Sequence, residues 1–194
     1  MKKTLFYLFV AVSFIACTNQ STHSSDTQTN VTAKNDEIKT GGAKLIQVDG
    51  KYNVWTKKIG DGKIKVLLLH GGPGFTHDYM ECFEDFLPKE GIEIYYYDQL
   101  GCGNSDNPDD TAYWDLNRFV EEVEQVRKAL NLDKENFYLL GHSWGGILAM
   151  QYALKYQSNL KGLVISNMMS SCPDYDKYAE NVLSKQFDPV VLDS

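Results

Sequence analysis

The chain has 194 residues, and the roughly 150 that follow its N-terminal segments suffice for one hydrophobic core. Its 26 acidic and 19 basic residues give a net charge of −7. A nucleic-acid partner is not expected, because binding phosphates requires a basic patch. We interpret the acidic balance mainly as that of a solvated surface, which is also compatible with attracting the cationic N-terminus of a peptide.

Residues 1–17 predict a lipoprotein-type signal peptide. Lys2 and Lys3 precede a mostly apolar run of twelve residues, Leu5 to Ala16. A membrane-spanning helix needs about 20 such residues, so we interpret the run as a cleaved signal. The step from Ala16 to Cys17 resembles the processing site of bacterial lipoproteins, in which Cys17 is lipidated. We expect an exported protein, anchored to a membrane by lipid only, on the periplasmic or cell-surface side; plain secretion is the alternative.

Residues 18–42 are rich in Ser, Thr, Asn and Gln and have almost no large apolar side chains. Such a composition cannot repay the entropy of ordering, so we expect a disordered tether. Removal of the signal, with Lys2 and Lys3, leaves 17 basic and 26 acidic residues and a charge of −9.

The cysteines predict neither a disulfide framework nor a metal site. After Cys17 there are three, Cys82, Cys102 and Cys172, an odd number without metal-ligand spacing. We find no His, Cys or carboxylate cluster with such spacing and expect no metal or cofactor. Cys102 has no basic neighbour in sequence to lower its thiol pKa, so a structural or pocket-lining role is favoured over a reactive thiol.

From residue 43 on, a hairpin is followed by alternating strands and helices. Asp49-Gly50 is a tight-turn signal between apolar runs at residues 45–48 and 52–55. Further strands are expected at residues 64–69, 92–97, 137–140 and 160–166, and helices at 78–87, 116–130 and 145–156. The pattern predicts an α/β fold, a three-layer sandwich with a mostly parallel sheet.

Two of these helices have an expected apolar face. In the helix at 78–87, it consists of Tyr79, Phe83, Phe86 and Leu87. In the helix at 116–130, it consists of Leu116, Phe119, Val120, Val123, Val126 and Leu130. Glu121, Glu122, Arg127 and Lys128 are expected mostly outside this second face, which is therefore typical of a core-packing helix.

The segment Gly141-His142-Ser143-Trp144-Gly145 is a G-x-S-x-G motif between an expected strand and an expected helix. A strand, a sharp turn and a helix place the serine hydroxyl at the carboxyl end of a strand, where open α/β sheets bind ligands. We predict that Ser143 is a catalytic nucleophile. His142 points away from its neighbour on such a turn and is expected to be structural.

A second motif, His70-Gly71-Gly72-Pro73-Gly74, follows the expected strand at residues 64–69. Its glycines let a backbone N–H approach a substrate carbonyl, and the residue after the nucleophile supplies a second N–H. We predict an oxyanion hole made of the backbone amides of Gly72 and Trp144. His70 is expected to form hydrogen bonds with the loop backbone, and His77 either to line the pocket or to belong to a loop or a helix start.

A third motif, Asp98-Gln99-Leu100-Gly101-Cys102-Gly103-Asn104-Ser105, follows the expected strand at 92–97. Together, HGGPG, DQLGCGNS and GHSWGG resemble the proline iminopeptidase family of α/β-hydrolases, serine peptidases that remove an N-terminal proline from peptides. The resemblance spans about residues 44–170. It implies the α/β-hydrolase fold, a peptide substrate, Ser143 as nucleophile, and the Gly72 and Trp144 amides as oxyanion hole.

The resemblance also implies catalytic groups that this chain lacks. In that family an Asp and a His follow the nucleophile, beyond a helical cap, whereas His23, His70, His77 and His142 all precede Ser143. Loss of the histidine costs about a millionfold in one serine protease. We therefore expect a core at residues 43–170 truncated after about the sixth strand, the start of a cap at 171–194, and a chain inactive alone. The alternatives are an esterase or lactonase, or a non-catalytic lipoprotein with this scaffold.

Overall fold

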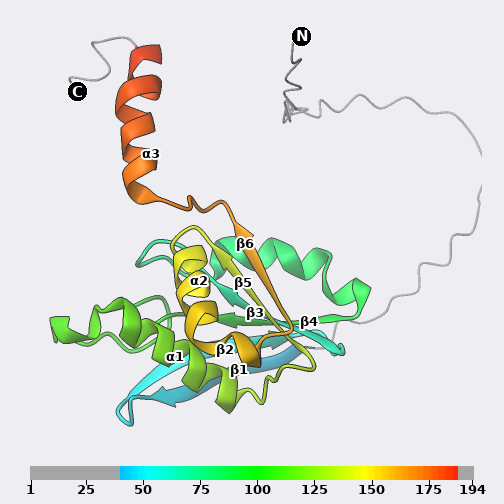
Figure 1. Cartoon of the computed structure of the whole chain (residues 1–194). Helices are drawn as coiled ribbons and strands as arrows, with labels where there is room; N and C mark the ends of the chain where they lie inside the picture. Colours follow the sequence, from blue (N-terminus) through cyan, green and yellow to red (C-terminus); the bar gives the residue numbers. More distant parts are fainter. Residues whose placement is uncertain (1–39, 188–194) are drawn as a thin grey trace, which may run out of the picture. The chain divides into compact units, whose positions relative to one another are not determined.

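The structure is a computed structural model that describes residues 40–187. The predicted signal peptide at residues 1–17, with Cys17, and most of the predicted tether at 18–42 lie outside these residues. Within residues 40–187, six strands form one sheet in the order β1-β2-β4-β3-β5-β6 (Figure 1). No helix in this range combines the length and apolarity needed to cross a membrane.

The sheet begins with a hairpin and continues as a parallel sheet, as expected. Strand β1 pairs antiparallel with β2, and β2 antiparallel with β4. The neighbours β4, β3, β5 and β6 are all parallel. The bounds are β1 Thr40–Val48, β2 Tyr52–Ile59, β3 Ile64–Leu69, β4 Ile92–Tyr97, β5 Phe137–His142 and β6 Gly162–Ser166. Strand β1, which is irregular between Thr40 and Gly42, starts inside the range assigned to the tether.

The helical segments connect these strands. The α-helices are α1 Leu116–Ala129, α2 Trp144–Tyr156 and α3 Cys172–Tyr178. The 3₁₀-helices are η1 Asp78–Asp85, η2 Pro88–Glu90, η3 Thr111–Tyr113, η4 Gln157–Asn159 and η6 Ser184–Gln186, and η5 Ala179–Leu183 is a π-helix. Helix α1 begins where the Asp115 side chain accepts a hydrogen bond from the Arg118 N–H, a typical N-cap.

The core lies on both faces of the sheet, which makes three layers. Alternate residues of a strand point to opposite faces. In β3, Leu67 and Leu69 pack in a cluster with α1 and α2, whereas Val66 and Leu68 pack in a second cluster with Met80 of η1. The three-layer α/β sandwich predicted from the sequence is therefore confirmed.

The segment at 78–87 differs from the predicted helix. It is a 3₁₀-helix, η1, that ends at Asp85, and Phe86 is 67% exposed while Tyr79 is 43% exposed. Of the predicted apolar face, Phe83 and Leu87 pack against the second cluster, whereas Tyr79 and Phe86 do not, because residues three apart share a face in a 3₁₀-helix. Met80 and Phe83 accordingly pack in the second cluster.

Helix α1 packs as predicted with one exception. Its expected apolar residues are buried or packed against the first cluster. Glu122, expected outside, has no exposed surface. It is buried because the N–H of Leu100, the hydroxyl of Tyr97 and the guanidinium of Arg118 all donate hydrogen bonds to its carboxylate.

Candidate active site

Ser143 occupies a sharp turn between β5 and α2. Its φ of 54° and ψ of −123° are rare for a residue with a side chain. The N–H of Ser143 donates to the Ser166 carbonyl of β6 at 3.0 Å, and the Ser143 carbonyl accepts from the Gly146 N–H at 2.7 Å. Hydrogen bonds on both sides thus hold a strained backbone, at the carboxyl end of the parallel strands.

Two glycines let neighbouring backbones approach this turn. A Cβ on Gly145 would lie 2.1 Å from the Leu69 carbonyl oxygen, so α2 could not pack against the end of β3 with any other residue there. A Cβ on Gly71 would lie 3.1 Å from the Ser143 Cβ. The loop at residues 71–74, hereafter the glycine loop, therefore lies directly beside Ser143.

The two predicted oxyanion-hole amides come from the glycine loop and from the start of α2. The Gly71 N–H is already used, because it donates to the Tyr79 hydroxyl at 2.7 Å. Trp144 is the first residue of α2, where backbone N–H groups have no partner inside the helix. In the glycine loop, Gly72 has a φ of 123° and is exposed to solvent. This arrangement is compatible with an oxyanion hole made by the Gly72 and Trp144 amides.

Gln99 forms hydrogen bonds both with His70, which precedes the glycine loop, and with Trp144, the first residue of α2. The sequence alone did not predict this role. The Gln99 backbone N–H donates to His70 Nε2 at 3.0 Å, and its side-chain amide donates to the His70 carbonyl at 3.1 Å. The Trp144 indole N–H donates to Gln99 Oε1 at 2.9 Å. Only its position directly after β4, in the third motif, signalled a role at the carboxyl edge of the sheet.

His70 bonds loop backbone, as expected. Because its Nε2 accepts from Gln99, its Nδ1 carries the proton and donates to the Gly71 carbonyl at 2.9 Å. Burial lowers the pKa of His70 below its ordinary value and so favours this neutral form. His70 is therefore a structural link between β3 and the segment after β4.

The other two described histidines are engaged elsewhere. His142 Nδ1 lies 3.0 Å from the Tyr79 hydroxyl, and His77 Nδ1 lies 2.8 Å from Asp98 Oδ1. In the range 40–187, no histidine is hydrogen-bonded to Ser143. The described part of the chain thus presents the turn at Ser143 without a histidine bonded to that serine.

An apolar pocket of about 340 Å³ opens next to Trp144 and Gly74. Its other lining residues are Pro73, Gln99, Leu100, Gly101, Cys102, Asn107, Trp114, Leu116 and Phe119. Burial raises the pKa of the Cys102 thiol to about 11. Cys102 is thus a protonated, pocket-lining residue, in agreement with the favoured interpretation of the sequence.

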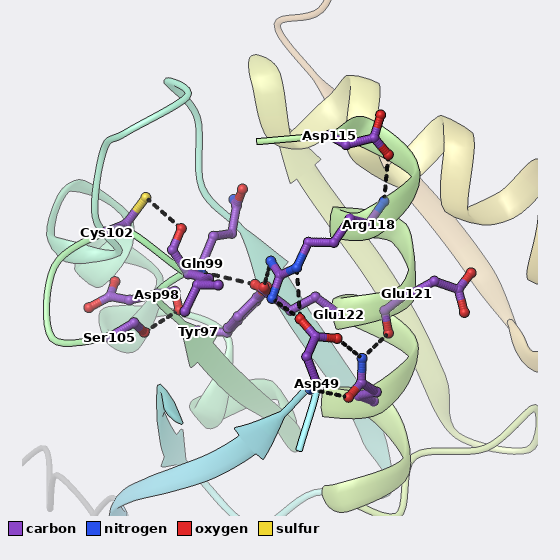
Figure 2. Close-up of polar contacts among 12 residues, drawn as sticks. Asp49, Tyr97, Asp98, Gln99, Cys102, Ser105, Asp115, Arg118, Glu121 and Glu122 are labelled. Atoms are coloured by element: carbon purple, nitrogen blue, oxygen red, sulfur yellow. Dashed lines mark hydrogen bonds and ion pairs between the residues drawn. The ribbon is translucent and has the colours of Figure 1, made fainter. Parts of the chain in front are cut away.

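A buried polar network supports the segment that carries Gln99 (Figure 2). Arg118 of α1 donates to Glu122 and, through Nε at 2.9 Å, to Asp49 in the hairpin turn. Glu122 in turn accepts from the Leu100 N–H at 3.0 Å. Figure 2 shows how this network connects the β1–β2 turn, α1 and the residues after β4.

Curated relatives match most of this chain. A proline iminopeptidase of Elizabethkingia meningoseptica is 67% identical over 144 residues, which are 74% of this chain and 48% of the relative. A proline iminopeptidase of Flavobacterium johnsoniae is 64% identical over 144 residues, again 74% and 48%. The chain therefore spans about half the length of the curated relatives that it matches.

Comparisons of structure and of family agree with the sequence relatives. The crystal structure of proline iminopeptidase from Mycobacterium smegmatis superposes with a TM-score of 0.69 at 28% identity, covering 76% of this chain and 50% of that one. Residues 65–190 match the family described as alpha/beta hydrolase fold, which covers more than half of the chain. The chain belongs to the alpha/beta hydrolase fold family and is similar in sequence to the proline iminopeptidases.

Proposed function

We propose that this chain supplies the nucleophile and the oxyanion hole of a serine aminopeptidase that releases N-terminal proline, or another N-terminal residue, from peptides. The observation that carries the proposal is the strained turn at Ser143, which lies against the glycine loop and follows β5. The identity of 67% to a protein named proline iminopeptidase supports the choice of substrate class.

The proposed chemistry is acyl transfer through a covalent intermediate. The Ser143 Oγ attacks the carbonyl carbon of the substrate's first residue, and its proton passes to a histidine that the described residues do not supply. The Gly72 and Trp144 amides donate to the oxyanion that forms. The amine of the rest of the peptide leaves with that proton, and water then hydrolyses the ester on Ser143.

A chimera tests the proposal. Residues 44–187 of this chain replace the homologous segment of the Elizabethkingia meningoseptica relative; the chain is 67% identical to that relative over 144 residues. We expect the chimera to hydrolyse a proline anilide. The Ser143→Ala chimera should lose about a millionfold in turnover, the effect of removing the nucleophile in a serine protease. The 194-residue chain alone is the matched control and should show no turnover above background.

The substrate panel separates the candidate activities. Simple esters are assayed beside the anilide, since the same motifs support ester hydrolysis. A folded chimera that cleaves esters but not the anilide would contradict the aminopeptidase proposal. A folded chimera whose anilide turnover survives Ser143→Ala would contradict the assigned nucleophile.

A further inference from the structure

We propose that His77, Asp78 and Glu81 form a binding site for a divalent transition-metal ion, zinc in the first place. Their ligand atoms all lie within 4.8 Å of one another. The sequence predicts no metal site here, because no His, Cys or carboxylate cluster in it has a familiar ligand spacing. The fold of η1 brings the three groups together, outside the site around Ser143.

The His77 ring is oriented as the ring of a metal-binding histidine is. Its side chain is 7% exposed, and its Nδ1 lies 2.8 Å from Asp98 Oδ1. The same oxygen accepts from the His77 backbone N–H at 2.9 Å, while Asp98 Oδ2 accepts from the Asn104 N–H at 3.0 Å. A fixed, buried carboxylate thus keeps the proton on Nδ1. Carboxylate partners of this kind orient most metal-binding histidines and leave Nε2 free to ligate.

The remaining nitrogen of His77 faces two carboxylates. Nε2 lies 3.5 Å from Asp78 Oδ1 and 3.9 Å from Glu81 Oε1, and it makes no hydrogen bond to the described residues. A lone pair that faces two anionic oxygens is repulsive unless a cation lies between them. The ring cannot turn away, because Trp55 stacks on it with a centroid distance of 4.2 Å.

The distances between the three ligand groups fit tetrahedral coordination of an ion after small movements of the side chains. Zinc bonds of about 2.1 Å place tetrahedral ligands about 3.4 Å apart, close to the separations from Nε2. Asp78 and Glu81 are free to adjust, since their side chains are 73% and 51% exposed. Their exposure also leaves the fourth position to water. An imidazole ligand favours zinc over magnesium or calcium, which prefer oxygen ligands only.

The groups around the cluster leave the ligand atoms available. The Thr76 hydroxyl donates to Asp78 Oδ2 at 2.6 Å, the oxygen that does not face His77. Lys57 is the competing cation, with its Nζ 3.9 Å from Glu81 Oε1. Its nearer partner is Glu84, at 3.2 Å, and this pairing can persist when the ion binds.

A bound ion would also steady the glycine loop. It would link residues 77, 78 and 81, and Tyr79 lies between these ligands in the chain. The Tyr79 hydroxyl accepts from the Gly71 N–H and contacts His142, which precedes Ser143. Since an ion that binds the folded state stabilises it, we expect zinc to raise the melting temperature of the protein.

Zinc titration of the full chain tests the site. Cys17, Cys82 and Cys172 are first replaced by serine, because Cys82 and Cys172 are exposed thiols and could bind zinc themselves. Zn²⁺ is then titrated against a chromophoric chelator. We expect one equivalent to bind, with Glu81→Gln and Asp78→Asn each weakening the affinity at least tenfold. Asp85→Asn, on the same helix but outside the cluster and exposed, is the matched control and should change it less than twofold.

A second measurement keeps the assignment independent of the variants. Long-range ¹H–¹⁵N spectra of the imidazoles should show the His77 Nε2 signal moving on addition of one equivalent of Zn²⁺, while the His70 signals stay in place. Absence of saturable binding would overturn the proposal, as would binding that Glu81→Gln and Asp78→Asn leave within twofold.

Discussion

Gly145 is the residue on which the approach of α2 to β3 depends. A Cβ there would lie 2.1 Å from the Leu69 carbonyl oxygen and 2.7 Å from the His70 carbonyl oxygen. Both are backbone atoms at the end of a central strand, so neither can rotate away. We expect Gly145→Ala to lower the free energy of unfolding by about 3 kcal/mol, the upper range for overpacking a core. Urea unfolding followed by circular dichroism measures it.

Gly146→Ala is the matched control for that prediction. The nearest atom to a Cβ on Gly146 is the Met168 Cβ at 2.8 Å, which can move only with its backbone but lies in the irregular segment after β6, and the nearest backbone oxygen, that of Gly141, is 3.4 Å away. Alanine also gains about 1 kcal/mol over glycine in a helix. We therefore expect the loss of stability in Gly146→Ala to be about 1 kcal/mol or less. Equal stability of Gly145→Ala and the unchanged protein would refute the packing argument.

Residue types and their spacing predict part of this site and miss the rest. Ser143 and the glycine loop are visible in the sequence because each sits in a short motif directly after an apolar strand. The roles of Gln99 and Glu122 are not visible, because their hydrogen bonds join residues 45 and 22 positions apart. A polar residue at the end of a strand or on a helix gives no sign of its partner until the sheet order is known.

The position of α1 relative to its neighbouring elements depends on the pair Arg118 and Glu122. Burial raises the pKa of Glu122 above its ordinary value, and the Arg118 guanidinium opposes that rise. Arg118→Ala would leave a buried, uncompensated carboxylate, so we expect a loss of about 3 kcal/mol of stability at neutral pH. Urea unfolding of Arg118→Ala, and of Arg118→Ala combined with Glu122→Gln, measures this loss and its recovery.

The pH dependence of the Arg118→Ala variant gives a second check. A group whose pKa is raised in the folded state contributes stability at low pH and loses it as the pH rises through that pKa. Without Arg118 the pKa of Glu122 rises further, so the deficit of the variant should grow as the pH rises above the ordinary pKa of a glutamate, about 4.3. In the double variant, which has no ionisable group at 122, the deficit should be smaller and nearly constant. A deficit that is independent of pH in the single variant would show that Glu122 is not its cause.

At the level of elements, the periodicity of apolar residues predicts the long and regular strands and helices. All six strands and the helices α1 and α2 lie where the apolar patterns place them, to within a few residues. The segment at 78–87 was mispredicted because its apolar residues are too few to distinguish about three residues per turn from 3.6. Tertiary packing of Met80 against the sheet decides between the two.

On the scale of the whole molecule, β6 is an edge strand of the sheet with exposed apolar side chains. Within the described residues it has a strand neighbour, β5, on one side only. Leu163, Val164 and Ile165 are 38%, 45% and 41% exposed. Since alternate residues point to opposite faces, both faces of β6 present apolar side chains to solvent. An apolar edge strand of this kind is a template for pairing with another chain.

We therefore expect the isolated 194-residue chain to associate with itself at micromolar concentration, and Val164→Lys to shift it toward the monomer. A lysine on an edge strand opposes pairing, because two such strands would bring like charges together. Phe86→Lys is the matched control, since Phe86 is 67% exposed but lies outside the sheet. Sedimentation velocity over a range of concentrations measures the association. A chain that is monomeric throughout, or equal responses to Val164→Lys and Phe86→Lys, would show that the β6 edge does not drive pairing.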